Sequence, residues 1–478
     1  MSTFEETTTV HAFRDDALGD HDAVGLAEAI RRGEVSAGEA ARDAAARVRA
    51  VEGRLHAVQV HVDSPAPAPG TGSGARTGSG ALAGVPTFVK DNTDHRGLPT
   101  GHGSAAFTPS AALRHGPFTE QFLSTGVTVL GKTRLPEFGF SPSTEYEDAE
   151  PVRNPWNTGR SAGGSSGGSA ALVAAGAVPI AHANDGGGSI RIPSACCGLV
   201  GLKPTRGRVV ANPQSSRLPV DLVSDGVVTR SVRDTAAFLA AAETHWRNPK
   251  LPPVGLVEGP SGRRLRVGFL LDSPTGVRID SDTHAAVTGT VATLERLGHR
   301  VEPVAMDLDP RFTEDFLTYW GMLSFLLGTT GRSLGADFDR HRMDGLSRGL
   351  REQYLRNWRR TPAIVRRLKR IKVAYAAAFR GLDLVLSPVL AHTTPRLGHL
   401  SPAVPYPTLI ERILAYVAFT PVDNVVGTPS LSLPTPHPTA EGLPVGVMFT
   451  ARPGAERTLL ELAFELEADR PFRRVQDL

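Results

Sequence analysis

Two serines in this chain stand among glycines, and a lysine precedes both of them at the end of an apolar segment. Ser165 lies in "GGSSG", residues 163–167, and Ser189 closes "DGGGS", residues 185–189. Consecutive glycines present backbone N–H groups without Cβ obstruction, which is what an oxyanion hole beside a nucleophile requires. A serine hydroxyl becomes a strong nucleophile only when a base takes its proton. The pattern therefore indicates acyl-transfer chemistry, provided that a base is close.

Lys90 is the candidate base. It ends the apolar segment "AGVPTFVKD", residues 83–91, and burial lowers a lysine pKa because it disfavours the charged form. The alternative for Lys90 is a side chain that extends from the strand end into water. Lysine is rare among the 52 basic residues, so each one retained draws attention. The lysines are Lys90, Lys132, Lys203, Lys250, Lys369 and Lys372.

Two shorter motifs compete with this interpretation, and the first is "GVTVLGKT", residues 126–133. It fits the phosphate-loop pattern G-x-x-x-x-G-K-T. Such a loop turns successive backbone N–H groups around a phosphate, which needs unusual backbone angles. Val127, Thr128 and Val129 are β-branched and resist those angles. Residues 127–132 therefore predict a strand and not a nucleotide site.

The second competing motif is the nucleophile elbow G-x-S-x-G, which "GGSSG" also fits. An elbow needs a strand directly before the serine. The preceding "VRNPWNTGRSA", residues 152–162, is rich in Asn, Pro and Gly and predicts an irregular loop, although residues 169–176 predict a helix. His182 or a later His would complete a Ser-His-Asp triad, but a lone His beside an apolar segment is more often a core residue. The elbow is kept as a minor alternative.

The totals exclude several classes of protein. Of 478 residues, 40% are hydrophobic and 21% charged, which is ordinary for a globular protein with a large core. A net charge of +3 is too small to imply a nucleic-acid or membrane partner. Two adjacent cysteines cannot build a disulfide framework, the polar N-terminus does not resemble a signal peptide, and no run of about 18 apolar residues occurs. These features predict a cytoplasmic protein.

The elements that would position the site alternate between helix and strand. Residues 22–34 and 36–52 predict helices, the second opened by a capping box of Ser36 and Glu39. The Pro/Ala- and Gly/Ser-rich segment 64–80 predicts a flexible loop. Further predictions are a helix at 119–126, a strand at 264–270, a helix at 281–298, helices within 311–380, and strands at 383–390 and 429–435. The alternation predicts an α/β fold, with strands from both ends of the chain in one sheet.

One dense basic run occurs, at residues 356–372. A solvated helix face is the usual explanation for such a run, and a nucleic-acid surface is the alternative. We interpret it as surface.

Several long segments resemble the amidase signature family. They are "AGVPTFVKDN", "GKTRLPEFGFSPSTE", "NPWNTGRSAGGSSGGSAALVAAG" and "NDGGGSIRIPSACCGLVGLKPTRGRV", and the resemblance continues through "GTPSLSLPT" and "GLPVGVMFTARPGAERTLLELAFELE". The resemblance implies a single large α/β/α domain with a twisted, mixed β-sheet core. Its expected parts are N-terminal helices (1–63), a flexible loop (64–80), a signature core (81–210) and the remaining sheet with substrate-pocket helices (211–478).

The resemblance also implies a Ser-Ser-Lys triad. Ser189 would be the nucleophile, Ser165 the bridging serine, and Lys90 the base that later acts as an acid. The Gly164–Ser165 peptide would be cis. No metal or cofactor is needed for this chemistry. The oxyanion hole would be formed by the N–H groups of Gly186, Gly187, Gly188 and Ser189.

The expected substrate-binding residues come from the same resemblance. Similarity to fatty acid amide hydrolases indicates an apolar acyl or aryl site, and Tyr319 and Trp320 are candidates to close it, with core positions as the alternative for these aromatics. Asn184 stands where the family commonly has Thr and is expected to keep a supporting hydrogen bond. The "HANDGGGSIRIP" segment resembles the branch that includes cyclic-dimer nylon-oligomer hydrolases. The residues expected at the acyl site are Phe138, Gly139, Phe140 and Ser141.

The expected partner is a small-molecule amide, with neither nucleic acid nor membrane, and a homodimer is left open. Two alternative functions remain. One is the amidase subunit of a tRNA-dependent amidotransferase, against which the apolar Phe138 and Phe140 argue. The other is a non-catalytic binding protein on the same fold, against which the presence of all three catalytic residue types argues.

Overall fold

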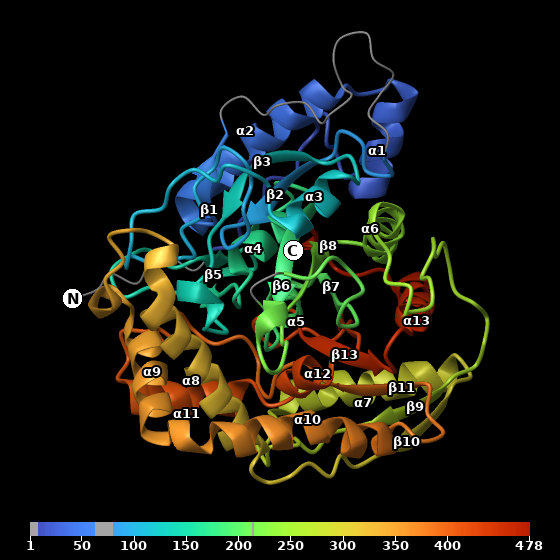
Figure 1. Cartoon of the computed structure of the whole chain (residues 1–478). Helices are drawn as coiled ribbons and strands as arrows, with labels where there is room; N and C mark the ends of the chain where they lie inside the picture. The colour runs from blue at the N-terminus through green and yellow to red at the C-terminus, as the bar shows by residue number, and fades with distance from the viewer. Residues whose placement is uncertain (1–7, 63–79, 213–214) are drawn as a thin grey trace.

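An eight-stranded mixed sheet runs through the centre of the computed structural model, which describes residues 8–62, 80–212 and 215–478 (Figure 1). The predicted flexible loop 64–80 lies outside the described residues, except for Gly80. The strands are β1 Val58–His61, β2 Pro86–Lys90, β3 Thr128–Thr133, β4 Arg153–Asn154, β5 Asn157–Ser161, β6 Ile180–Asp185, β7 Val200–Lys203, β8 Ser224–Thr229, β9 Arg266–Phe269, β10 Arg300–Pro303, β11 Leu384–Pro388, β12 Ser430–Pro434 and β13 Gly446–Ala451.

The helices largely match the predicted pattern. Ser36 and Glu39 form the predicted capping box, and the helices expected within 311–380 are present. The α-helices are α1 Ala23–Arg32, α2 Ala37–Leu55, α3 Pro117–Leu123, α4 Gly167–Ala174, α5 Arg191–Cys197, α6 Val232–His245, α7 Ser281–Arg296, α8 Phe312–Thr330, α9 Gly345–Asn357, α10 Thr361–Ala378, α11 Tyr406–Tyr416, α12 Pro421–Val426 and α13 Glu456–Asp469.

The eight-stranded sheet joins strands from distant parts of the chain. Its order is β10-β9-β11-β13-β12-β7-β8-β6, and the link between its two parts is the antiparallel pair β7–β12, where Leu202 faces Leu431. The pairs β10–β9 and β9–β11 are parallel, whereas the other pairs of this sheet are antiparallel. The expected α/β class with a mixed central sheet is confirmed, as is the expectation that early and late strands share it.

A smaller sheet contains Lys90 and lies beside the edge strand β6 of the large sheet. Its order is β1-β3-β2, and β2 runs beside β6, to which the Thr87 hydroxyl donates a hydrogen bond at the Ile180 carbonyl (2.8 Å). Residues 128–133 form the fully buried strand β3. This confirms the predicted strand and shows that the phosphate-loop interpretation of 126–133 is wrong.

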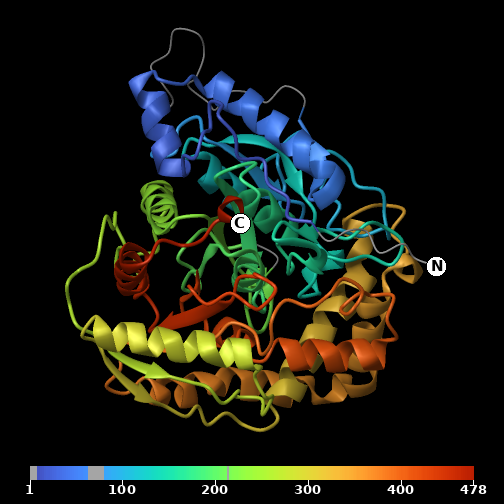
Figure 2. The ribbon, with the colours of Figure 1, turned by 180° about the vertical axis from the view of Figure 1, so that it is seen from behind.

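Helices cover both faces of the large sheet. In β11, Leu384 and Leu386 pack in one core cluster with α7, whereas Val385 packs in a second cluster with α10. Successive residues of a strand point to opposite faces, so α7 and α10 lie on opposite sides of the sheet. Figure 2, which views the molecule from the side opposite to Figure 1, shows α7 in front of the sheet.

The segment 152–162 differs from the prediction. Instead of an irregular loop it forms the short hairpin β4–β5. The Asn154 side chain stabilises the turn, since its Nδ2 donates to the Ser161 carbonyl at 3.0 Å and its Oδ1 accepts from the Trp156 N–H at 3.0 Å. The Asn and Pro that indicated a loop are therefore the turn residues of a hairpin.

The basic run 356–372 falls largely on α10, an amphipathic helix. Ile364, Leu368 and Ile371 are buried, whereas Lys369 and Arg370 on the same helix are exposed. This confirms the predicted solvated helix face. Within the described ranges, no helix is both long and apolar enough to cross a membrane.

Candidate active site

Lys90 is the last residue of β2, and its side chain is fully buried. Every position of β2 is buried, because the strand pairs with β3 and packs beside β6. The Lys90 Nζ makes three hydrogen bonds: to Ser165 Oγ and Asn184 Oδ1, both at 2.7 Å, and to Ser166 Oγ at 3.0 Å. The alternative of a side chain extending into water is therefore wrong.

The environment of Lys90 favours its neutral form. Burial lowers the pKa of Lys90 to about 7, although the carboxylates of Asp225 and Asp185 act in the opposite direction. A buried ammonium loses its hydration, whereas a neutral amine loses little. A large fraction of Lys90 is consequently uncharged near neutral pH, which is the state a general base needs.

His182 neighbours Lys90 but belongs to the core. Its Nδ1 accepts a hydrogen bond from the Lys90 backbone N–H, and its Nε2 pairs with Asp225 Oδ1, both at 3.2 Å. The side chain is fully buried and packs against Phe118. Both ring nitrogens are engaged, so His182 has no free nitrogen with which to activate Ser165. The nucleophile-elbow alternative is thus wrong about the base, because the hydrogen-bond partner of Ser165 Oγ is Lys90 and not a histidine.

Ser165 is held in a tight bend before α4. The Gly164–Ser165 peptide is cis, as the resemblance implied. A Cβ on Gly164 would lie 2.6 Å from the Ser141 carbonyl oxygen, so only glycine allows the segment to pass so close to residues 141–143. Ser165 is 3% exposed, and this small exposed part lines a cavity.

The glycine loop after β6 contains the predicted oxyanion donors, and one of them already donates a hydrogen bond to a side chain of the protein. The Gly188 N–H donates to Asp185 Oδ1 at 2.7 Å. This contradicts the expectation that Gly188 is a free donor, because the carboxylate of Asp185 is already its acceptor. In contrast, the N–H groups of Gly186, Gly187 and Ser189 donate to no acceptor within the described ranges.

Asp185 anchors that loop from beneath. Arg191 makes a two-pronged contact with its carboxylate, at 2.9 and 3.0 Å, and Asn424 Nδ2 donates to it at 2.8 Å. Burial alone would raise the pKa of Asp185, but the Arg191 guanidinium holds this pKa below its usual range. The Thr420 hydroxyl donates to the Gly187 carbonyl at 2.6 Å. The Gly187–Gly188 peptide is therefore fixed from both sides, by Thr420 at its carbonyl and by Asp185 at its N–H.

Two cavities meet at Ser189. We call the larger the central cavity; its volume is about 480 Å³, and Ser165, Asn184, Gly186 and Ser189 are among its lining residues. We call the smaller the apolar cavity; its volume is about 70 Å³. Its lining includes the side chains of Ile192, Phe316, Leu317, Leu346, Leu350, Ile410, Ile413, Leu414 and Val417.

The structure brings most of the predicted substrate-binding residues to these cavities. Phe138 and Asn184 line the central cavity, and Ser141 lines the apolar one. Asn184 makes the expected supporting hydrogen bond, since its Oδ1 accepts from Lys90 Nζ. Gly139, Phe140 and Trp320 line both cavities.

Tyr319 does not line either cavity. It is 1% exposed, its hydroxyl donates to the Val220 carbonyl at 2.7 Å, and it accepts from the Val220 N–H at 2.9 Å. The expectation that Tyr319 closes the pocket is therefore wrong. Neighbouring residues of a helix point about 100° apart, so Trp320 faces the cavities while Tyr319 faces the core.

Sequence reasoning missed several residues around the triad. Ser166 and Asn92 join the hydrogen-bond network of Lys90, the latter through a mutual contact of side-chain amides with Asn184 at 3.1 and 3.3 Å. Their positions next to Ser165 and just after Lys90 were the available signal. Thr420 and His102 come from segments with no such pattern, and only the fold brings them here.

The other lysines of the signature region serve different purposes. Lys132 forms a buried ion pair with Asp91 at 2.8 Å, and Lys203 donates to the Pro204 carbonyl at 3.0 Å. Among the described residues, no group of three His, Cys, Asp or Glu side chains is arranged to hold a metal ion.

Comparison with known proteins finds similarity over most of the chain. The family model described as "Amidase" matches residues 44–460. A Mycobacterium leprae protein named "Putative amidase AmiC" is 49% identical over 98% of this chain and 99% of its own. A 6-aminohexanoate-cyclic-dimer hydrolase of Pseudomonas sp. (strain NK87) is 34% identical over 94% of this chain and 95% of its own.

A solved structure resembles the fold over nearly its whole length. It is a 6-aminohexanoate cyclic dimer hydrolase, with a TM-score of 0.83 and 30% sequence identity, and the match covers 97% of this chain and 99% of that one. The similarity therefore extends well beyond the glycine-rich segments.

Proposed function

The chain belongs to the amidase signature family and hydrolyses carbon–nitrogen bonds, and we propose that it does so through an acyl-enzyme on Ser189. The observation that carries this proposal is the buried 2.7 Å hydrogen bond between Lys90 Nζ and Ser165 Oγ. It supplies a base whose pKa, lowered by burial to about 7, suits proton transfer near neutral pH.

Acylation begins when the Ser189 Oγ attacks the amide carbonyl carbon. Its proton passes to Ser165 Oγ, while the Ser165 proton passes to neutral Lys90 Nζ. The carbonyl electron pair moves onto oxygen, and the N–H groups of Gly186, Gly187 and Ser189 stabilise the oxyanion. When the tetrahedral intermediate collapses, the C–N bond breaks and the leaving nitrogen takes a proton returned through Ser165. The acyl group remains on Ser189.

Deacylation uses the same relay with water as the nucleophile. Water adds to the ester carbonyl and gives its proton through Ser165 to Lys90. Collapse then breaks the bond to Ser189 Oγ, which recovers its proton, and the carboxylic acid leaves. Lys90 is thus a base in the first half of each step and an acid in the second.

The two cavities support an orientation for the substrate. Ser165 lines the central cavity and is not among the lining residues of the apolar one. The leaving nitrogen must lie near Ser165 because its proton arrives from there. The acyl group then extends the other way, from Ser189 into the apolar cavity, whose size and lining suit a short apolar acyl chain.

The alternative activity is that of an amidotransferase subunit, which hydrolyses the side-chain amide of glutamine to release ammonia. Glutamine carries an ammonium and a carboxylate at the far end of its acyl part. Among the described residues that line the apolar cavity none is charged, so nothing there would pair with those groups. This observation favours a stand-alone amidase with an apolar acyl substrate.

The variant Lys90→Ala tests the proposed relay. We expect the kcat of amide hydrolysis to fall by roughly 10²–10⁴-fold, because the base that accepts the Ser165 proton is lost. Circular dichroism and the urea midpoint should stay near those of the wild type, since the hydroxyls and amide around Nζ can bond to one another or to water. Unchanged hydrolysis in a folded Lys90→Ala protein would remove Lys90 from the mechanism.

A further inference from the structure

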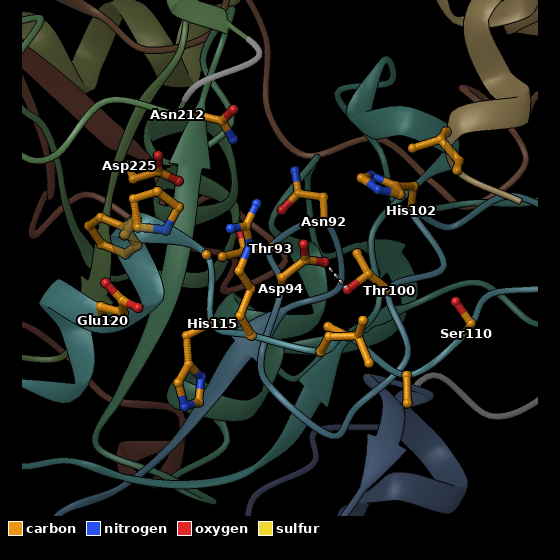
Figure 3. A pocket seen from close by; sticks show the side chains of 18 of the residues that line it. Asn92, Thr93, Asp94, Thr100, His102, Ser110, His115, Glu120, Asn212 and Asp225 are labelled. Atoms are coloured by element: carbon orange, nitrogen blue, oxygen red, sulfur yellow. Dashed lines mark hydrogen bonds between the residues drawn. The ribbon is translucent and has the colours of Figure 1, made fainter.

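A third cavity opens beside the catalytic one, and hydrolysis as described leaves it without a role. Its volume is about 740 Å³, and we call it the polar cavity (Figure 3). It lies over the chain that follows β2 and over the start of α3. Asn92, His102, Ser333 and Leu334 line both the polar and the central cavity, so the two spaces meet at these residues.

In the proposed orientation of the substrate, the leaving amine extends toward the residues where the central and polar cavities meet. With the acyl group in the apolar cavity and the nitrogen near Ser165, the rest of the amine extends through the central cavity. Asn92 stands on that route, since its side chain contacts Asn184, which in turn contacts Lys90. A small amine would stop in the central cavity, whereas a longer one would reach the polar cavity.

The lining of the polar cavity is predominantly anionic. It contains three carboxyl groups, those of Asp94, Glu120 and Asp225, against the single guanidinium of Arg114. Burial lowers the pKa of His102 to about 4 and also lowers that of His115, so both rings are neutral near pH 7. In the view of Figure 3, Glu120 and Asp225 lie to the left of Asp94, and His102 lies to its right.

Several polar groups of the cavity are fixed in place or still lack a partner. Asp94 accepts from the Thr100 hydroxyl at 2.8 Å, and its carbonyl accepts from the Thr119 hydroxyl at 2.7 Å, which ties it to α3. The Thr93 side chain is only 8% exposed and lines the cavity, yet its hydroxyl has no hydrogen-bond partner in the described part of the chain. The ring nitrogens of His102 also have no hydrogen-bond partner among the described residues. The backbone N–H of His102 donates to the Asp91 carbonyl at 2.9 Å.

The edge of the cavity provides apolar contact. Leu113 is 94% exposed, which is unusual for a leucine, and it lines the polar cavity beside Ala111 and Ala112. A hydrocarbon stem that crosses this edge would cover Leu113 and remove apolar surface from water.

We infer that the polar cavity binds the leaving amine of the substrate and favours amines whose far end carries an ammonium group. The alkyl stem would pass the junction at Asn92 and His102, and the ammonium would lie among the carboxylates of Asp94, Glu120 and Asp225. This inference rests on the proposed function, because the orientation of the amide comes from the Ser189 and Ser165 roles.

A matched substrate series tests it. The amides share one short apolar acyl group, and their leaving amines have equal chain length but end in methyl, hydroxyl, carboxylate or ammonium. We expect kcat/KM for the ammonium-ended amide to exceed that of the methyl-ended one by about tenfold at low salt, with the carboxylate-ended amide the slowest. Added salt should reduce this preference because it screens the carboxylates.

Glu120→Gln removes one carboxylate of the cavity without changing its shape. The ratio of kcat/KM for the ammonium-ended to the methyl-ended amide should fall roughly threefold in this variant. Glu295→Gln, an exposed residue on α7 outside the cavity, is the matched control and should keep the wild-type ratio.

The outcomes separate the two proposals. Equal rates across the series, a preference for the carboxylate-ended amide, or a Glu120→Gln ratio equal to that of the control would overturn the polar-cavity inference alone. Failure to hydrolyse the methyl-ended amide together with all the others would overturn the proposed function.

Discussion

At the scale of single residues, the proposed mechanism depends on the protonation state of Lys90. Its Nζ is surrounded by two hydroxyls and one amide oxygen, none of which carries charge. Burial therefore outweighs the more distant carboxylates of Asp225 and Asp185, and the pKa of Lys90 falls to about 7. Lysine can act as a base here because it is placed where water cannot stabilise its charge.

The pH dependence of hydrolysis follows from that pKa. Because the proposed mechanism uses the neutral amine of Lys90, kcat/KM should rise with pH through about 7 and then level off. The measurement is a pH profile with an uncharged amide, so that substrate titration does not interfere. A profile already flat well below pH 7 would contradict the role of Lys90.

The variant Asn184→Ala should shift this pH profile in a direction that the structure predicts. Asn184 Oδ1 accepts a hydrogen bond from Lys90 Nζ and so favours the charged form of the lysine. Its removal should lower the pKa of Lys90 further, and the acid limb of the profile should move to lower pH. A shift to higher pH would show that Asn184 acts in some other way.

The residues of the site differ in how far the sequence could predict them. Lys90 and Ser165 lie in segments whose residue types already suggest acyl transfer, and the structure brings them into contact. Gly188 lies in such a segment too, but its N–H is bonded to Asp185, which no pattern of spacing reveals. Tyr319 and Trp320 look alike in sequence, and only the packing of α8 separates them.

At the scale of elements, the start of α12 positions the glycine loop. Thr420 precedes this helix, and its hydroxyl holds the Gly187 carbonyl while Asp185 holds the next N–H. A peptide fixed at both its polar groups cannot rotate, so the neighbouring N–H groups stay directed as the loop requires. A Cβ on Gly188, whose φ is +134°, would lie 2.5 Å from the Thr420 hydroxyl oxygen.

Thr420→Val tests this positioning role. The variant keeps the shape of the side chain but loses the hydroxyl, so the Gly187 carbonyl loses its partner and the loop gains freedom. We expect kcat to fall about tenfold with little change in KM, which is less than the loss of a whole oxyanion donor. Thr420→Ser should restore most of the kcat, and a KM effect alone would contradict the role.

Elements could be predicted from sequence where periodicity was strong. Strand β3 and the Ser36 capping box follow from local chemistry that the fold does not override. The hairpin β4–β5 does not, because its stability depends on side-chain bonds from Asn154 to distant carbonyls, including that of Cys196. The apolar cavity also could not be predicted, since its walls come from α8, α9 and α11 together.

At the scale of the whole molecule, the large sheet couples early and late strands. The pair β7–β12 joins them, and Leu431 in that pair is fully buried. The proposed active site lies close to this strand pair: Ser189 follows β6, and Thr420 and Asn424 come from the segment before β12. We therefore predict that residues 1–478 unfold as a single domain.

Leu431→Ala tests this coupling. Loss of a fully buried leucine side chain should lower the free energy of unfolding by about 2–5 kcal/mol. Circular dichroism and tryptophan fluorescence in urea should still report one coincident transition. Leu113→Ala, at a 94% exposed position, is the control and should change stability by less than about 0.5 kcal/mol. Two separate transitions would contradict the single domain.

Labelling with a fluorophosphonate, followed by peptide mass mapping, tests the central claim most directly. The activated serine attacks phosphorus, fluoride leaves, and the adduct marks the nucleophile permanently. We predict a single adduct on Ser189 in the wild-type protein, and a large loss of labelling rate in Lys90→Ala. An adduct on Ser165 instead, or no adduct on any serine, would contradict the proposed mechanism.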